Sequence, residues 1–342
     1  MVDKKLNFAV IGCSGMAEGH MYGITDNKDK ANLYAICDTA PERLAERKEK
    51  FNWAIAVSDY RELVDDPNID AVVIVTPDQL HLEMTAAFLR AGKDVLCEKP
   101  MALTVAECEE MMRIEKETGR KLMIGQVCRC TPAFVQAKEL IDAGRIGELF
   151  FVESEYAHNY ARSGGYNNWR ITPERHGFIG GGCHAVDLLR WVAGDPTEVF
   201  AYSTHKCLTD WPVDDATIAI YKFPGEITGK VFASIGCKRG YTMRSVFYGT
   251  KGTIICDNTS PTMQLFENVE PGSEDFVTPQ ELEVNINNHN VSEEIRVFID
   301  ALLSEGPMPI SSMEGASTVA VACATVESAA KGVPVQIKYP EV

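Results

Sequence analysis

The sequence predicts an α/β protein in two parts, a doubly wound parallel sheet followed by an α+β domain whose large, mostly antiparallel sheet is flanked by helices. Short apolar strands alternate with charged helices up to residue 126, which is typical of a doubly wound sheet. Between 197 and 267, strand patterns follow one another without a helix, which indicates an antiparallel sheet. The 342 residues exceed what one core usually holds, so we expect two domains, at 1–124 and 125–342.

The N-terminal strands are short aliphatic runs that end at glycine, proline or a polar residue, and the helices between them carry charges at helical spacing. Pro41 stands at a first helical position and Gly92 at a helix end. The expected strands are 6–12, 31–38, 70–77, 94–100 and 121–126, and the expected helices are 16–24, 41–51, 80–93 and 104–119.

The second part begins with a helix over 131–147 and a helix that opens on "GGGCH" and ends at Gly194. The strands of the expected sheet follow. Two helices close the chain, at 292–303, with an apolar face, and from Ser311, which forms a capping-box pattern with Glu314.

Composition and charge exclude several classes of protein. The formal net charge of −16 argues against nucleic acid or an anionic membrane as the main partner. No window reaches the roughly 18 apolar residues of a membrane span, and the N-terminal sequence runs directly into a strand, so we expect a cytoplasmic protein. The 11 cysteines are scattered and odd in number, which predicts reduced thiols, and the C-x-C of Cys128 and Cys130 lacks a second pair, so we expect no metal site.

The turn "VIGCSGMAEGH" at 10–20 follows a strand and opens a helix, as a dinucleotide-binding loop does. A plain structural turn would also use glycine. Asp38, however, ends the second strand, where an acid accepts from the ribose hydroxyls and repels a 2′-phosphate. We therefore predict NAD rather than NADP, bound by a loop in which Ser14 takes the second glycine position and Ala17 the third. The expected loop residues are Gly12, Ser14, Gly15, Met16 and Ala17.

Three further segments complete an ordered set of motifs, "TPDQLH" at 76–81, "AGKDVLCEKPMALT" at 91–104 and "GGGCHAVDLLRW" at 180–191. With the N-terminal loop they resemble the Gfo/Idh/MocA family, the glucose–fructose oxidoreductase and inositol dehydrogenase group. The resemblance covers nearly the whole chain. It implies a Rossmann domain followed by a large-sheet domain that commonly mediates oligomers, and the use of NAD(P) to oxidise or reduce a ring hydroxyl or ketone of a sugar or cyclitol.

The resemblance implies roles around the nicotinamide. Lys99 of "EKP" would lose proton affinity beside a cationic nicotinamide, hydrogen-bond the substrate hydroxyl and stabilise a developing alkoxide. The alternative is a solvated loop lysine. Glu98 would order Lys99 or meet the carboxamide region. The turn at 76–81 would bind the cofactor through Thr76, Pro77 and His81, although capping or packing is as reasonable for the His81 ring.

His184 follows three glycines in the first turn of its expected helix. Glycine lets a ligand approach the backbone, and the positive helix end would keep the ring neutral and able to accept a proton. With the resemblance, His184 is the expected general base, and Asp187, on the same helical face, would bind a substrate hydroxyl or orient His184. The alternatives are a buried histidine bonded to backbone and a metal-binding H-x-x-D pair, for which no third ligand is apparent.

One position departs from the family pattern D-x-G-x-H. Gly180 stands where the aspartate is expected, whereas Gly182 and His184 match. That aspartate, where present, assists the proton relay or binds the substrate. Without it, either the relay uses His184, Lys99 and water alone, or the chemistry is altered, or another acid serves, namely Glu155, Asp187 or Glu174.

Aromatic and polar residues crowd the segment "ESEYAHNYARSGGYNNWR" at 153–170. Aromatic faces and hydrogen-bond donors suit a polyhydroxylated ring, although a flexible surface loop has the same composition. Arg129 matches a family position that often reaches the substrate, and a plain ion pair is the alternative. The expected substrate-binding residues are Asp187, Arg129, Tyr156, His158, Trp169 and Arg170.

These features predict an NAD-dependent dehydrogenase with Lys99 and His184 as catalytic residues. It would transfer hydride between a ring CH–OH and the nicotinamide, giving a keto-sugar, for example oxidised at C3, or an inosose. One alternative is a glycosidase that retains NAD and acts by oxidation and elimination, and another is a non-catalytic NAD-binding sensor. The expected partners are a sugar, glycoside or cyclitol and further copies of the chain, in a dimer or tetramer formed through the C-terminal sheet.

Overall fold

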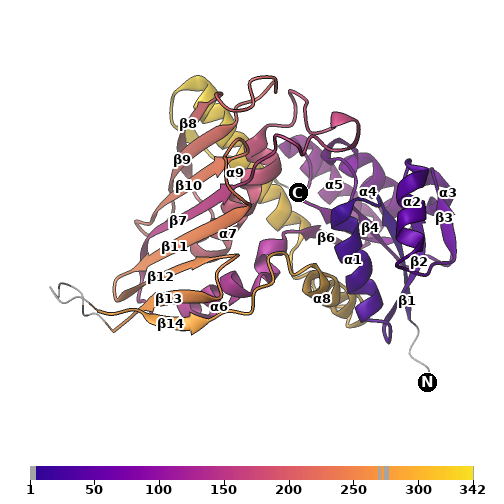
Figure 1. Cartoon of the computed structure of the whole chain (residues 1–342), viewed down its shortest axis with the longest axis horizontal. Helices are drawn as coiled ribbons and strands as arrows, with labels where there is room; N and C mark the ends of the chain where they lie inside the picture. The colour runs from indigo at the N-terminus through magenta and orange to yellow at the C-terminus, as the bar shows by residue number, and fades with distance from the viewer. Residues whose placement is uncertain (1–4, 269, 271, 273–276, 342) are drawn as a thin grey trace. The chain divides into compact units, whose positions relative to one another are not determined.

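The computed structural model describes residues 5–268, 270, 272 and 277–341. The chain divides into two compact units (Figure 1). Unit 1 comprises Met1–Gln126, Val291–Ala316 and Pro340–Val342, and unit 2 comprises Val127–Asn290 and Ser317–Tyr339. The first boundary lies two residues from the expected division. The chain then returns to unit 1 after residue 290, whereas a contiguous second domain was expected.

Unit 1 contains a parallel six-stranded sheet in the order β3-β2-β1-β4-β5-β6. The strands β4, β5 and β6 are buried almost throughout, because a parallel sheet carries helices on its faces, whereas the edge strand β3 is partly exposed. The chain reverses its direction of travel across the sheet between β1 and β4, which is where doubly wound sheets bind their ligands, outside the carboxyl ends of the strands. The predicted Rossmann sheet is confirmed. Its strands are β1 Leu6–Ile11, β2 Ala31–Cys37, β3 Ile55–Val57, β4 Ala71–Ile74, β5 Asp94–Glu98 and β6 Leu122–Gly125.

The helices of unit 1 begin and end at local sequence signals. In α5, Thr104 accepts a hydrogen bond from the Glu107 amide, while the Glu107 carboxylate accepts from the Thr104 amide, and Gly119 ends the helix in the left-handed conformation with φ of 64°. The bounds are α1 Gly15–Asp26, α2 Pro41–Lys48, α3 Arg61–Val64, η1 Asp78–Leu80, α4 His81–Arg90 and α5 Val105–Thr118.

Helix α8 (Val291–Leu303) joins unit 1 by packing against α1. A Cβ atom built on Gly23 of α1 would lie 2.8 Å from Cβ of Ile295, so glycine is what allows the two helices to approach this closely. Phe298 of α8 meets Phe8 of β1 edge to face, with ring centroids 6.0 Å apart. The apolar face predicted from the sequence therefore covers the Rossmann unit, which explains why the chain returns to it.

Unit 2 contains a nine-stranded sheet in the order β14-β13-β12-β11-β7-β10-β9-β8-β15. Its neighbouring strands run antiparallel except β7 and β10, which pair in parallel. The predicted mostly antiparallel sheet is confirmed, and the short edge strands β14 and β15 were not anticipated. The bounds are β7 Leu149–Ala157, β8 Glu198–Thr204, β9 Ala216–Lys222, β10 Thr228–Ser234, β11 Thr242–Gly249, β12 Gly252–Asp257, β13 Thr262–Phe266, β14 Gln280–Glu283 and β15 Val335–Gln336.

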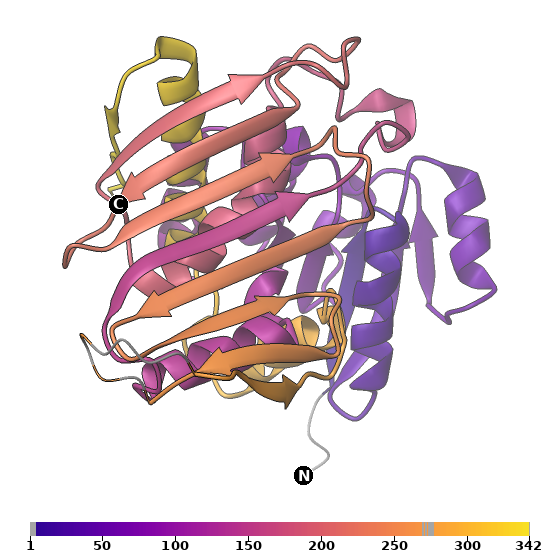
Figure 2. The same ribbon diagram turned by 60° about the vertical axis from the view of Figure 1, so that its left-hand side comes forward.

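One face of this sheet is covered by helices, which lie behind the strands in Figure 2. The strands alternate buried and exposed residues, as a half-covered sheet requires. The covering segments are η2 Val127–Cys130, α6 Pro132–Asp142, the π-helical turn η4 Phe178–Gly182, α7 Cys183–Ala193 and α9 Ser312–Lys331, of which the part from Ser317 belongs to unit 2.

The 11 cysteines, all of which the structure describes, form no disulfide with one another. Among the residues that the structure describes, no helix has the length and apolar character needed to cross a membrane.

Candidate active site

The turn after β1 has the geometry of a dinucleotide-binding loop. Gly12 has φ of +94°, and a Cβ built on it would lie 2.5 Å from the Val75 carbonyl oxygen, so no other residue fits. Ser14 is the N-cap of α1, and its side chain forms no capping hydrogen bond. The first amides of α1 are therefore placed to meet an anion. Gly15 is the first residue of α1. Met16 is half-buried, and Ala17 is buried.

Asp38 is fixed directly beside this loop. Its carboxylate accepts hydrogen bonds from the amides of Cys13 (2.7 Å) and Ala40 (2.8 Å), and it lies 3.4 Å from Nη1 of Arg43. A carboxylate offers about four acceptor positions, so Asp38 has capacity left for ribose hydroxyls. The residues present therefore fit a dinucleotide.

Two polar side chains at the carboxyl edge of the sheet are buried without a hydrogen-bond partner among the described residues. They are Thr76 after β4, through its Oγ1 atom, and Gln126 after β6, through both amide atoms. Gln126 is only 1% exposed. Orphaned buried polar atoms are costly, and an amide that offers a donor and an acceptor complements a carboxamide. Thr76 was among the residues predicted from the sequence, and Gln126 was not, because one glutamine after a strand carries no pattern.

His81 connects the turn at 76–81 with the "EKP" segment through two hydrogen bonds. Its ring is fully buried, with Nδ1 2.9 Å from the Pro100 carbonyl oxygen and Nε2 3.1 Å from that of Thr76, so both nitrogens donate. Burial alone would lower the pKa of His81, but Cys97, Asp78 and the Pro100 carbonyl raise it to about 10. The ring therefore holds the backbone of the turn at 76–81, where Pro77 precedes η1, against the "EKP" segment.

Glu98 lies at the end of β5, just before Lys99. Nε2 of His20 donates to Oε1 of Glu98 at 2.8 Å, and the Lys99 amide donates to Oε2 at 3.1 Å. Burial opposes ionisation, but His20 and Lys99 hold the pKa of Glu98 below its ordinary value. Glu98 is thus an anion that orders the backbone of Lys99, itself half-buried and joined to Pro100 by a cis peptide bond.

Glu294 of α8 is a second buried acid at this place. A carboxyl oxygen of Glu294, a ring nitrogen of His20 and an oxygen of Glu98 lie within 4.8 Å of one another, as groups that hold a metal do. Neither oxygen of Glu294 has a hydrogen-bond partner among the described residues. Burial and the charge of Glu98 raise the pKa of Glu294 well above its ordinary value, against the pull of Lys99. Glu294 was not predicted as a site residue, because an acid in an amphipathic helix is expected to face solvent.

In unit 2, His184 lies inside a continuous helical segment rather than at a free helix end. The π-helical turn at 178–182 leads directly into α7, so the predicted effect of the helix N-terminus on His184 loses its geometric basis. The ring is buried, stacks on Tyr156 with centroids 5.7 Å apart, and its Nδ1 lies 3.4 Å from Sγ of Cys128. Gly181 makes room for this stack, since a Cβ there would lie 2.6 Å from Cε1 of Tyr156.

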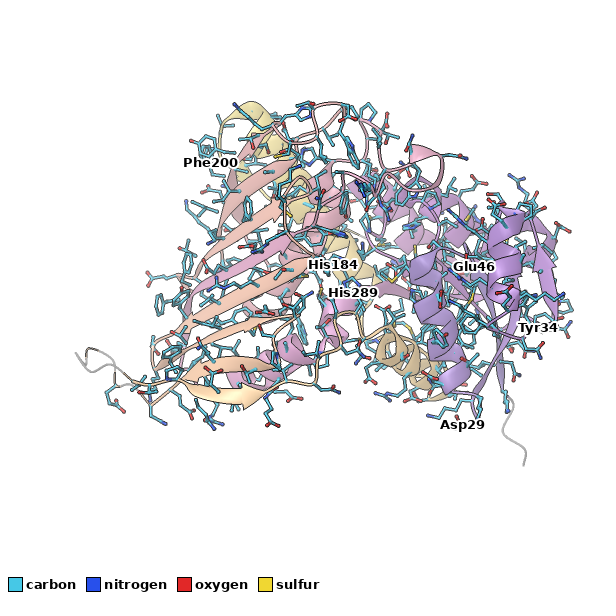
Figure 3. The ribbon with its side chains drawn as sticks, viewed as in Figure 1. Asp29, Tyr34, Glu46, His184, Phe200 and His289 are labelled. Carbon is cyan, nitrogen blue, oxygen red and sulfur yellow. The ribbon has the colours of Figure 1, made fainter. Side chains whose placement is uncertain are left out.

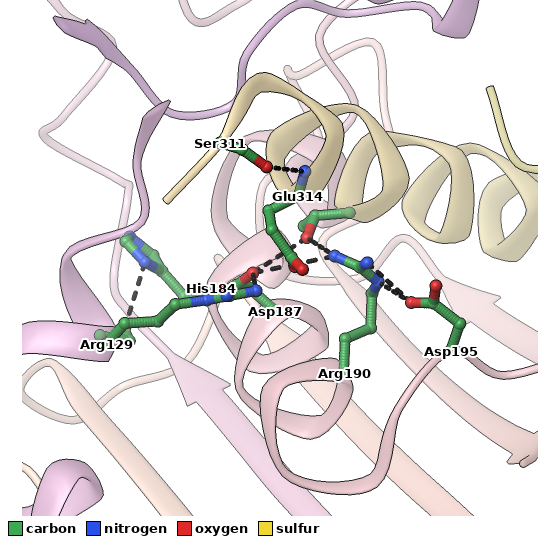
Figure 4. A network of polar contacts seen from close by, with 9 residues as sticks. Arg129, His184, Asp187, Arg190, Asp195, Ser311 and Glu314 are labelled. Carbon is green, nitrogen blue, oxygen red and sulfur yellow. Dashed lines mark hydrogen bonds and ion pairs between the residues drawn. The ribbon is translucent and has the colours of Figure 1, made fainter. Parts of the chain in front are cut away.

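Asp187 forms a buried ion pair with Arg129, drawn in Figure 4. Nε and Nη2 of Arg129 donate to its two oxygens at 2.9 and 2.7 Å, and Thr318 of α9 donates at 3.1 Å. Arg190 donates to Thr318 and to Asp195. The structure thus brings two predicted substrate ligands together as partners of each other, so their substrate role stays a prediction.

Around His184 lies a cluster of aromatic hydroxyls and imidazoles. The hydroxyl of Tyr156 is 2.8 Å from that of Tyr160 and 3.2 Å from Nδ1 of His158. Burial raises the pKa of Tyr156 well above its ordinary value, so the hydroxyl stays neutral. His289 lies beside His184, with ring centroids 5.6 Å apart (Figure 3), and is bonded to Tyr241. Sequence reasoning missed Tyr160, Tyr241 and His289, of which the last two lie far along the chain.

The predicted residues Trp169 and Arg170 form a second group with Arg175. The guanidinium carbon of Arg170 is 4.5 Å from the Trp169 ring centroid and that of Arg175 is 4.9 Å from it. The acids considered as substitutes for the missing aspartate either form ion pairs with arginine or are exposed to solvent. Glu155 is paired with Arg239, Asp187 with Arg129, and Glu174 is exposed.

A parallel Rossmann sheet with a dinucleotide loop, joined to a large antiparallel sheet that carries a buried histidine, defines an NAD-dependent oxidoreductase of two-domain type. The model described as "Oxidoreductase family, NAD-binding Rossmann fold" matches residues 6–126, and the "GFO/IDH/MocA C-terminal domain" matches residues 134–255. The chain belongs to the Gfo/Idh/MocA oxidoreductase family.

Curated relatives agree with this assignment. The myo-inositol 2-dehydrogenase of Thermotoga maritima is 30% identical over 84% of this chain and 85% of its own. The inositol 2-dehydrogenase 2 of Saccharopolyspora erythraea is 28% identical over 97% and 96%. Among solved structures, levoglucosan dehydrogenase in complex with NADH has a TM-score of 0.89 and 24% identity, covering 98% of this chain and 100% of its own. At that identity the likeness shows the fold.

Proposed function

We propose that this protein oxidises a ring CH–OH of a sugar, glycoside or cyclitol to the ketone with NAD, giving a keto-sugar, for example at C3, or an inosose. The observation that carries the proposal is the His184 cluster. A buried imidazole stacked on a tyrosine, with further tyrosine hydroxyls and imidazoles around it, offers a base and several hydrogen-bonding groups. That combination suits a polyhydroxylated ring. The names of the inositol and levoglucosan dehydrogenases are in accord with this substrate class.

Bound NAD would accept the hydride from the carbon. We assign the hydroxyl proton to His184, as general base, and the stabilisation of the developing oxyanion to Lys99. Hydride and proton together account for the two electrons and two hydrogens that the alcohol loses. Gly12, Ser14, Gly15, Met16, Ala17, Asp38, Thr76, Pro77, His81, Glu98 and Lys99 are the residues proposed for cofactor binding, to which the structure adds Gln126.

Purified protein incubated with NAD and a panel of sugars, glycosides and inositols tests this. We expect NADH absorbance at 340 nm with at least one compound, and a ketone in the product by mass spectrometry. Release of an aglycone without net NADH would instead identify the NAD-retaining glycosidase, and NAD binding without any turnover would identify a sensor.

We also propose that the open face of the unit 2 sheet joins copies of the chain. Large apolar side chains stand outward on neighbouring strands, and their exposed fractions are high for such residues. Tyr202 pairs with Ile218, and Phe200 with Ile220, across β8 and β9. The exposed fractions are 51% for Phe150, 64% for Tyr202, 43% for Ile218 and 53% for Ile220. Light scattering should give a dimer or tetramer, and a monomer at micromolar concentration would contradict it.

A further inference from the structure

The guanidinium of Arg175 occupies the space into which the family's aspartate would project. Gly180 stands at that aspartate's position. A Cβ atom built on Gly180 would lie 2.3 Å from Cζ and from Nη2 of Arg175, and 2.5 Å from Nη1. Arg175 is only 2% exposed. The guanidinium therefore lies flat against the backbone of the π-helical turn, and only glycine at 180 permits it.

This exchange reverses the chemistry of the position. A carboxylate accepts hydrogen bonds and can take up a proton, whereas a guanidinium only donates and stays charged. Arg175 therefore does not replace the aspartate as a relay. A guanidinium fork instead binds an oxyanion through two parallel N–H···O bonds.

The guanidinium is held in place by an aromatic support. Its Cζ lies 4.9 Å from the Trp169 ring centroid, and Arg170 lies 4.5 Å from the same ring. Trp169 in turn packs on Gly165, where a Cβ would lie 2.2 Å from Nε1. Two positive groups thus converge on one indole, which orients Arg175 and raises the local positive potential.

Arg175 lies against Gly180, about one helical turn before the proposed base. Four residues rise about 6 Å along a helix, which is on the order of the length of one sugar ring. A sugar with a hydroxyl at His184 can therefore carry a second substituent toward the guanidinium.

We infer that the sugar oxidised by this protein carries an anionic oxygen group, a carboxylate or a phosphate, that Arg175 binds. The inference rests on the proposed function and narrows its substrate class. Arg175 would then determine substrate specificity, and its guanidinium occupies the space of the missing aspartate.

Binding to the NADH-saturated protein tests the inference by calorimetry, with methyl β-D-glucuronide, glucose 6-phosphate and neutral methyl β-D-glucoside as probes. We expect at least one anionic probe to bind tenfold or more tightly than the glucoside, and the better of the two identifies carboxylate or phosphate. Arg175→Met should remove that preference, whereas Arg162→Met, a matched loss of an exposed charge from the same segment, should keep it. Equal binding of all probes by the wild type, or an unchanged preference in Arg175→Met, overturns the inference.

Arg175→Lys provides a second variant, which keeps the positive charge but loses the planar guanidinium fork. Its preference for the anionic probe should fall about tenfold, while the melting temperature shows that the chain folds. This variant decides the question if Arg175→Met does not fold. Anion binding without hydride transfer to any probe would defeat the proposed function and leave the inference standing. Turnover of the neutral glucoside with no anion preference would do the reverse.

Discussion

Asp187 of unit 2 and Glu294 of unit 1 are both fully buried acids, and their surroundings differ. Asp187 of unit 2 is bonded through both oxygens to Arg129 and also to Thr318. Glu294 of unit 1 has no hydrogen-bond partner for either oxygen among the described residues. A buried charge needs such partners, whereas a buried acid without them stays protonated.

The difference extends to other polar groups of unit 1. Thr76, Gln126 and Nδ1 of His20 are likewise buried without a partner among the residues described. In unit 2, the hydrogen bonds of Asp187 to Arg129 and Thr318 connect α7 with η2 and α9. Unit 1 keeps polar atoms unmet at the edge where the dinucleotide is expected. The hydrogen bonds of Asp187 connect three helical segments of unit 2, whereas the buried polar atoms of unit 1 are available to a ligand or to water.

The sharpest test asks whether both units serve one reaction. Lys99→Met in unit 1 and His184→Phe in unit 2 should each lower kcat by about 10²–10⁴-fold, because each removes a group that handles the substrate proton or oxyanion. NADH binding, followed by fluorescence titration, should persist in His184→Phe and should weaken by less than about tenfold in Lys99→Met, because Lys99 is also a proposed cofactor contact. Lys116→Met, at an exposed site of α5, is the matched control. Near-normal turnover in either variant would remove that residue from the catalytic assignment.

The frame of unit 2 should be costly to break. Asp187→Ala leaves Arg129 buried without its partner, so the free energy of unfolding should fall by about 3–5 kcal/mol. Thr318→Val, which removes one hydrogen bond, should cost about 1 kcal/mol. Urea titrations of both variants would measure these losses. A loss below about 1 kcal/mol in Asp187→Ala would show that the ion pair does not stabilise the fold.

Glu294→Gln should act in the other direction. Because the pKa of Glu294 is raised in the folded chain, the folded state holds a proton that the unfolded state releases above about pH 4.5. Stability from this group is present at low pH and is lost as the pH rises toward the raised value. The glutamine variant should match the wild type near pH 4 and exceed it by about 1–3 kcal/mol at pH 8. A difference that does not change with pH would contradict the protonated state.

The smallest effect concerns the cofactor. Thr76→Val and Gln126→Leu should each weaken NAD binding by about tenfold, which corresponds to about 1.4 kcal/mol. Stability should change little, because neither side chain has a hydrogen-bond partner among the described residues. Thr85→Val is the matched control, since its hydroxyl is also buried without a partner among the described residues but lies within α4. Equal weakening by all three would show a general packing effect instead.

The sequence was informative where a signal is local. The loop at Gly12, Asp38 at a strand end, and the strand periods of both sheets lie within single segments, and the structure has both predicted sheets. Arg175, Glu294 and His289 were not predicted, because their positions depend on segments far apart or on a turn with no periodic signature. The π-helical turn also escaped, since its glycines resemble a helix start. Gly180 was recognised as a departure, but only the three-dimensional contact shows what fills its place.

The return of α8 to unit 1 has a consequence for synthesis on the ribosome. Gly23 of α1 lies in close contact with Ile295 of α8. The ribosome adds Ile295 only after most of unit 2 has been translated. The nascent Rossmann segment therefore exposes an apolar helix face until α8 has been translated, and such a surface favours aggregation. A chain truncated after Asn290 should be cleaved rapidly by protease at α1, whereas the full chain should resist.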